Sequence, residues 1–183
     1  MEYSKEIHEL FLMQQAYATL MSAANKLEKQ ADKYYKKLTS RQYMAILAIL
    51  HLPPDETTVK NIAKKLGTTK QNANQLLTTV EKKGYITISG SDIDKRSVNI
   101  KVTDAGLQAM VENGEIGTIF MADIFNGFDE KELATLWHLL KKLHCFDGEK
   151  FSGFEDDASQ RLEGDYSDLQ AKALEEFKRR RNR

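Results

Sequence analysis

The chain of 183 residues is 41% hydrophobic and 30% charged, and its positive and negative charges balance to a formal net charge of zero. This length excludes two unrelated domains and suits one globular domain with an appendage, while the single cysteine excludes an internal disulfide and fits a reducing cytosol. The longest apolar run, YMAILAILHL, is too short to cross a bilayer, so we expect a cytoplasmic protein with no membrane partner.

The composition predicts a mainly helical protein whose charge is unevenly distributed. Ala, Leu, Lys, Glu and Gln are abundant, and the only two prolines lie side by side at Pro53 and Pro54. Residues 57–101 carry nine basic and three acidic residues, a net charge of +6, whereas residues 102–164 carry five basic and thirteen acidic residues, a net charge of −8. Such a separation of charge usually means that the basic segment forms the face that meets an anionic partner.

The first predicted element is one long helix, because apolar residues recur at spacings of three and four from Leu10 to Tyr34. At about 1.5 Å per residue this helix approaches roughly 40 Å, which is longer than a compact domain needs to cover its own core. We therefore expect part of the apolar stripe to meet a second chain. The segment LTSRQYMAILAIL predicts the next helix, with Thr39 as its cap and Gln42 answering it three residues later.

Residues 59–78 meet the steric requirements of a helix-turn-helix. Ala63 lies where the first helix must approach the second closely, and Gly67 lies where the turn needs a left-handed residue. Thr68, with Gln71 three residues later, is the expected cap of the second helix. The positions that are expected to face the core are Val59, Ile62, Leu66, Ala73, Leu76 and Val80.

The outward face of that second helix is rich in amides, which can bond to adenine edges in the major groove of DNA. Its candidate DNA-binding residues are Thr69, Lys70, Gln71, Asn74, Gln75 and Thr78. Lys64 and Lys65 are expected to contact phosphates, which adds affinity without sequence information. The alternative is an ordinary solvated helix surface; the turn spacing and the hairpin that follows favour DNA binding.

A two-stranded hairpin follows the helix pair, since YITIS and VNIKVT alternate apolar and polar residues around a turn at residues 90–97. Lys95 and Arg96 would form the tip of a wing that reaches the adjacent minor groove, whose negative potential attracts basic side chains. Asp94 is placed to orient the guanidinium of Arg96. The alternative for this turn is a hairpin end that only improves solubility.

Two further helices are predicted after the hairpin. One begins at Thr103, and the other is an amphipathic helix through Leu133, Trp137 and Leu140. The glycine-rich and acidic residues 147–164 are typical of a linker.

Over about residues 5–145 the sequence resembles the MarR family of transcriptional regulators. The resemblance rests on LTSRQYMAILAIL, on VKNIAKKLGTTKQNANQLLTTVEKKGYI and above all on DIDKRSVNIKVTDAG, which is similar to the family's wing signature with the arginine at Arg96. It implies an obligate homodimer built from the first and last helices, a winged helix-turn-helix in each subunit, and binding to double-stranded, pseudo-palindromic operators. It also implies a regulator that often acts as a repressor and is released by a small ligand.

These expectations give a mainly α fold: a winged helix-turn-helix with long N- and C-terminal dimerisation helices and a small β-hairpin wing. The expected divisions are an N-terminal dimerisation helix at 1–38, the DNA-binding domain at 39–103, C-terminal dimerisation helices at 104–146, and a linker with a helical extension at 147–183. The extension departs from the family pattern. We expect its helical stripe to pack on the dimer, with the basic end KRRRNR in solvent.

The resemblance also implies a ligand crevice between the dimer helices and the winged domain. A small aromatic or apolar effector could be lined by Met13, Tyr17, Met21, Tyr43 and His51, although these residues could equally belong to the core.

No cofactor, metal site or catalytic motif is predicted. His138 and His144 are six residues apart and nearly opposite on a helix, so they cannot chelate one ion within a chain, and Cys145 is expected to be a structural thiol. Two alternatives remain open: a winged-helix module that binds proteins without reading DNA sequence, and a metal-responsive regulator.

Overall fold

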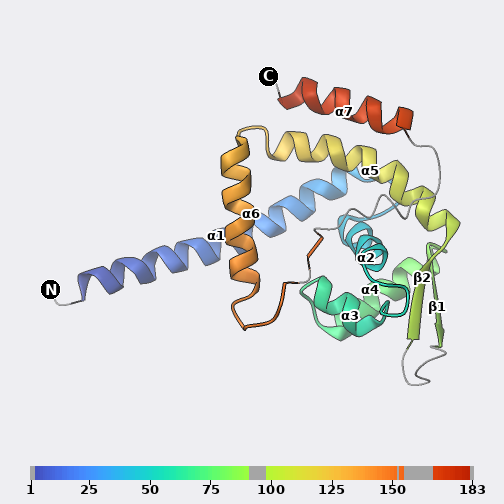
Figure 1. Ribbon diagram of the computed structural model, residues 1–183, viewed down its shortest axis with the longest axis horizontal. Coiled ribbons are helices and arrows are strands. Elements are labelled where there is room, and N and C mark those ends of the chain that lie inside the picture. Colours follow the sequence, from blue (N-terminus) through green and yellow to red (C-terminus); the bar gives the residue numbers. More distant parts are fainter. Residues whose placement is uncertain (1–2, 91–97, 152, 155–166, 182–183) are drawn as a thin grey trace.

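The computed structural model describes residues 3–90, 98–151, 153–154 and 167–181, and it confirms a mainly helical chain with one antiparallel hairpin (Figure 1). In chain order the elements are α1 (Ser4–Tyr34), α2 (Ser40–Leu50), α3 (Val59–Lys65), α4 (Lys70–Lys82), β1 (Ile86–Gly90), β2 (Val98–Val102), α5 (Asp104–Ile124), α6 (Glu130–His144) and α7 (Ser167–Arg181). None of the helices in this described part is long and apolar enough to cross a membrane.

The main core lies where α2, α3, α4 and the hairpin meet. Its fully buried side chains include Ile46, Ile62, Leu77, Ile86 and Ile100. The helix α2 begins as the sequence predicts, because Thr39 and Gln42 exchange the two hydrogen bonds of a capping box. The strands pair with Ile88 opposite Ile100, so the predicted alternation places one apolar face of the hairpin against the helices.

The helix-turn-helix forms around Gly67, whose φ of 61° is the left-handed conformation that the turn requires. The predicted cap is wrong by one residue: the Thr69 hydroxyl, and not that of Thr68, accepts a hydrogen bond from Asn72 N and starts α4. Leu66 is partly buried and packs against the core as expected, Leu76 is only partly buried, and the fully buried residues of α4 are Ala73, Leu77 and Val80.

Two helices leave apolar faces uncovered in the single chain. The helix α1 has 31 residues, about 46 Å at 1.5 Å per residue, and it projects far beyond the rest of the molecule (Figure 1). Ala31 is its only buried residue, while Leu10 and Tyr17 are 54% and 69% exposed. The helix α6 buries no residue at all, and its Trp137 is 51% exposed. Apolar faces of this extent usually belong to an interface.

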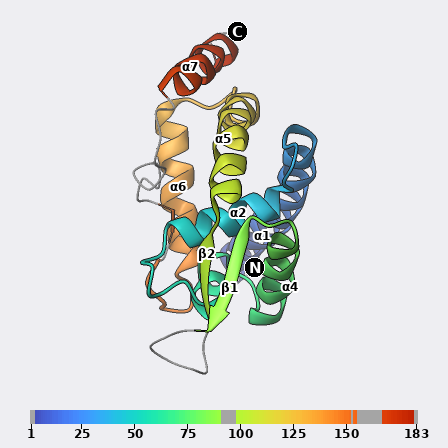
Figure 2. The ribbon, with the colours of Figure 1, turned by 90° about the vertical axis from the view of Figure 1, so that its right-hand side faces the viewer.

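The C-terminal helix packs against α5 of its own chain, and its basic end is only partly in solvent: Lys178 and Arg179 are exposed, whereas Arg180 and Arg181 are partly buried. The helix α7 lies along α5, at the end of the molecule opposite the hairpin (Figure 2). Arg180 pairs with Asp123 of α5 at 2.5 Å, and the Tyr34 hydroxyl of α1 donates to the same carboxylate at 2.8 Å. Arg181 donates to the carbonyl oxygens of Phe125 and Phe128, just past the end of α5. Arg181 therefore satisfies the carbonyl at the end of α5, and Arg180 pairs with a side-chain carboxylate; both partners lie far away in sequence.

Candidate functional site

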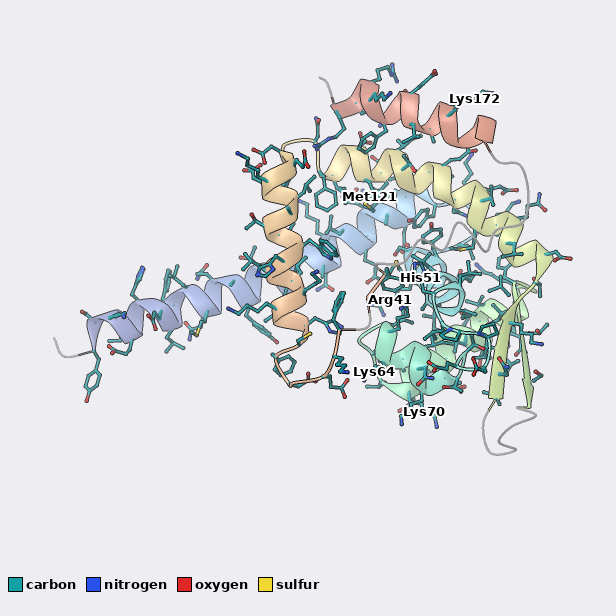
Figure 3. All side chains as sticks on the ribbon, in the orientation of Figure 1. Arg41, His51, Lys64, Lys70, Met121 and Lys172 are labelled. Carbon is teal, nitrogen blue, oxygen red and sulfur yellow. The ribbon has the colours of Figure 1, made fainter. Side chains whose placement is uncertain are left out.

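The site begins with the exposed face of α4. Ala73, Leu77 and Val80 are completely buried on its inner side, which fixes the rotation of the helix. Gln71, Asn74 and Gln75 consequently point outward and are exposed, together with Thr69 and Lys70 at the N-terminal end; Figure 3 shows Lys70 at the outer edge of the molecule. The structure thus brings together on one side of α4 the amide residues that the sequence singled out.

The side-chain amides on this face of α4 can still donate and accept hydrogen bonds. Among the described residues, none is hydrogen-bonded to the side-chain amides of Gln71, Asn74 or Gln75. Each amide offers a donor and an acceptor side by side, which is the pattern that matches the major-groove edge of adenine. Thr78 differs from the others, because it is partly buried and its hydroxyl donates to Asn74 O of its own helix at 2.9 Å.

The two lysines at the end of α3 differ in their surroundings. Lys64 is half exposed and its ammonium lies 2.9 Å from the Glu149 carboxylate. Lys65 is buried, donates to the carbonyl oxygen of Gly153 at 2.6 Å, and lies 5.2 Å from the centre of the Phe154 ring. The expectation that Lys65 contacts phosphate is therefore wrong in this structure. Helix periodicity could not reveal it, because Gly153, which accepts the hydrogen bond, is 88 positions away in sequence.

The wing is placed only at its base. The strand pairing extends as far as Gly90 opposite Val98, and the hairpin lies beside α4 (Figure 2). The candidate tip residues Asp94, Lys95 and Arg96 lie outside the described residues.

A cleft of about 1020 Å³ separates α1 and α5 from the helix-turn-helix. Leu27, Phe120 and Met121 contribute apolar side chains from one side, and Leu76 and Gln75 of α4 contribute from the other. The helix α4 and the long helices α1 and α5 therefore line the same cleft.

Several polar side chains line this cleft, and two of them lie at the start of α2. Arg41 forms an ion pair with Glu28 of α1 at 2.6 Å. Ser40 is 92% buried, and its hydroxyl has no hydrogen-bond partner within the described part of the chain. A buried hydroxyl without a partner is costly unless something fills the site. The cleft therefore combines apolar walls with the accessible guanidinium of Arg41.

The five residues expected to line a ligand crevice do not line this cleft. Met13, Tyr17 and Met21 lie on the projecting part of α1 and are 64%, 69% and 49% exposed. Tyr43 stacks on Tyr35 at 5.0 Å, and burial raises the pKa of its hydroxyl. His51 bonds through Nδ1 to Leu47 O at 2.9 Å. These five residues lie away from the cleft of the single chain, and their place in a crevice of the dimer stays a prediction.

The face of α2 that does line the cleft carries Ser40, Arg41 and Met44. Their spacings of three and four residues put them on one side of a helix, so the sequence held this signal. A preference for aromatic side chains as ligand contacts does not select Ser40 or Arg41, which are polar.

No three His, Cys, Asp or Glu side chains among the described residues are arranged to hold a metal ion. Cys145 caps the end of α6 and is partly buried.

Comparisons with known proteins agree with this geometry. The model of the MarR family matches residues 36–97, which span α2, the helix-turn-helix and the start of the hairpin. The organic hydroperoxide resistance transcriptional regulator of Bacillus subtilis (strain 168) is 34% identical over 122 residues, which cover 63% of this chain and 83% of that protein.

Solved structures show the same fold. A MarR/EmrR family transcriptional regulator from Acinetobacter sp. ADP1 is 26% identical, with a TM-score of 0.62 over 72% of this chain and 94% of that one. A mutant MarR from E. coli complexed with operator DNA is 22% identical, with a TM-score of 0.62 over 73% of this chain and 97% of that one.

Proposed function

The chain belongs to the MarR family of transcriptional regulators, and from this premise we propose that it acts in the cytoplasm as a homodimer that reads operator DNA through α4. The observation that carries this proposal is the exposed amide face of Gln71, Asn74 and Gln75 on a correctly formed helix-turn-helix. In this geometry α4 enters the major groove, and the amides bond to base edges. Lys70 and Lys64 bind flanking phosphates.

The wing supplies the second contact. Lys95 and Arg96, with Asp94 orienting the arginine, reach the minor groove beside the half-site that α4 reads. The position of the hairpin base beside α4 supports this assignment.

A second copy of the chain covers the open faces of α1 and α6. The exposed Leu10, Met13 and Tyr17 of α1 and Trp137 of α6 support this assembly, because contiguous apolar faces of this length seldom stay in water. Two-fold symmetry then places the two recognition helices about 34–36 Å apart, one turn of duplex DNA, and the operator is pseudo-palindromic.

The cleft between the long helices and α4 is the effector site in this proposal. An apolar or aromatic ligand fills the space between Phe120 and Leu76, and its polar group reaches the guanidinium of Arg41. Because Gln75 lines the same cleft, an occupant changes the position of α4 relative to α1 and α5. A ligand that binds more tightly to the shifted position of α4 than to the DNA-bound position favours release from DNA and so relieves repression.

Selection of bound sequences from a pool of randomised duplexes tests the reading function. Wild type should enrich a defined site, and Gln75→Ala should relax the preference at one position in each half-site, because a bidentate amide contact is worth about 1–3 kcal/mol of discrimination. Gln108→Ala is the matched control, since Gln108 is an exposed amide on α5. A Gln75→Ala profile identical to that of wild type would reject direct readout by this residue.

A further inference from the structure

The segment that follows α6 folds back onto the helix-turn-helix and crosses the end of α3. We call residues 147–154 the strap; residue 152 lies outside the described residues. Figure 1 shows the strap leaving the lower end of α6 and reaching α3, and Figure 3 shows Lys64 beside it. The strap therefore connects α6, which we place in the dimer interface, with the helix-turn-helix that we place on DNA.

The strap is anchored by its last two residues. The Lys65 ammonium donates to Gly153 O at 2.6 Å and lies over the Phe154 ring, and Phe154 packs edge-on against His51 at 5.3 Å. Phe154 also contacts the main hydrophobic core. A charge-assisted hydrogen bond, a cation–π contact and apolar burial at one point make this a specific attachment.

With the strap anchored in this way, the carboxylate of Glu149 is held at Lys64, 2.9 Å from its ammonium. Lys64 lies in the last turn of α3, directly before the Gly67 turn and the N-terminus of α4. That end of the helix pair favours an anion, because Lys64, Lys70 and the α4 dipole act together there. The acidic group thus occupies the position that a DNA phosphate takes in the proposed complex.

We propose that the strap is a built-in competitor of DNA: Glu149 neutralises Lys64 in the free protein and must leave it when a phosphate binds. The proposal rests on the proposed DNA-binding function. The strap itself carries Asp147, Glu149 and Lys150, a net charge of −1, and it lies against a segment, residues 57–101, that carries +6. An intramolecular acid of this kind lowers affinity for all duplexes alike and leaves base preference unchanged.

Glu149→Gln tests the competition in a fluorescence titration with a labelled random-sequence duplex at fixed low salt. Because both partners are half exposed, we expect a tightening of only about two- to fivefold. Glu175→Gln is the matched control: it makes the same charge change on an exposed position of α7 and should leave affinity near that of wild type. In a Lys64→Gln background, Glu149→Gln should have no effect, since the pair no longer exists.

Equal affinities of Glu149→Gln and wild type would overturn the competition, and so would a tightening that persists in the Lys64→Gln background. A tightening by Glu175→Gln equal to that of Glu149→Gln would also overturn it, because net charge alone would then explain the effect.

Hydrogen exchange of the full-length wild type with and without the duplex separates the strap from the reading function. We expect DNA to slow exchange in α4 and to speed it in the strap. If DNA slows exchange in α4 but does not speed it in the strap, the competition by the strap is overturned and the DNA-binding function stands. No change in α4 overturns the DNA-binding function and the strap with it.

Discussion

At Gly106 the hairpin packs so closely against α5 that any larger residue should lower the stability of the fold. It lies in the first turn of α5, where its amide donates to the Thr103 cap at 3.1 Å. A Cβ added there would overlap the carbonyl oxygen of Tyr85 and lie 2.8 Å from Val102 Cγ1. The overlapping atom belongs to the backbone, and Tyr85 O already accepts a hydrogen bond from Thr103 N, so it cannot move aside cheaply.

Gly106→Ala should therefore lower the free energy of unfolding by about 1–3 kcal/mol, the usual cost of forcing an extra methyl into a packed site. For a chain of this size that corresponds to a fall in Tm of roughly 3–10 °C. Gly114→Ala is the matched control in the same helix, because an added Cβ there meets no atom within 4 Å. It should raise stability by about 0.5–1 kcal/mol, since alanine is the better helix former.

Thermal unfolding followed by far-ultraviolet circular dichroism, at one protein concentration for all variants, provides the measurement. The two substitutions should shift Tm in opposite directions. If Gly106→Ala unfolds at or above the Tm of wild type, the close packing of the hairpin base against α5 is not what the geometry indicates.

Three further outcomes follow from the structure. Met13→Glu, on the exposed apolar stripe of α1, should shift the chain from dimer to monomer in sedimentation velocity, whereas the control Gln15→Glu on the opposite side of the helix should not; a dimeric Met13→Glu would exclude this face from the interface. Arg96→Ala should weaken binding to the selected duplex at fixed salt without changing its preferred sequence, and unchanged affinity would count against the wing. The pKa of Asp123 is lowered by hydrogen bonds from Arg180 and Tyr34, so its contribution to stability is present above the unfolded-state pKa of about 4 and is lost as pH falls through the folded-state value. The difference in Tm between wild type and Asp123→Asn should therefore shrink between pH 6 and pH 3, and a constant difference would refute the linkage.

Local patterns predicted the elements of this fold well. The Gly67 turn, the Thr39 capping box and the alternation in the hairpin each depend on residues only a few positions apart, and the structure confirms all three. The outward placement of Gln71, Asn74 and Gln75 was also predictable, because the buried side of α4 fixes the opposite side.

Contacts between distant segments were not predictable in the same way. The sequence predicts an exposed Lys65, but Gly153 and Phe154 cover it in the structure. It likewise predicts a solvated Arg180, which instead binds Asp123, 57 positions away. In both cases a basic side chain satisfies a group whose position depends on how the extension folds back. Helical periodicity carries no information about such partners.

Replacement of single adenines by 7-deaza-adenine in the selected duplex tests most directly whether the amides of α4 read adenine in the major groove. The analogue removes the N7 acceptor and leaves base pairing intact. We expect symmetric positions in the two half-sites at which wild type loses about 1–3 kcal/mol of binding free energy. Unchanged affinity at every adenine of the site would contradict the account.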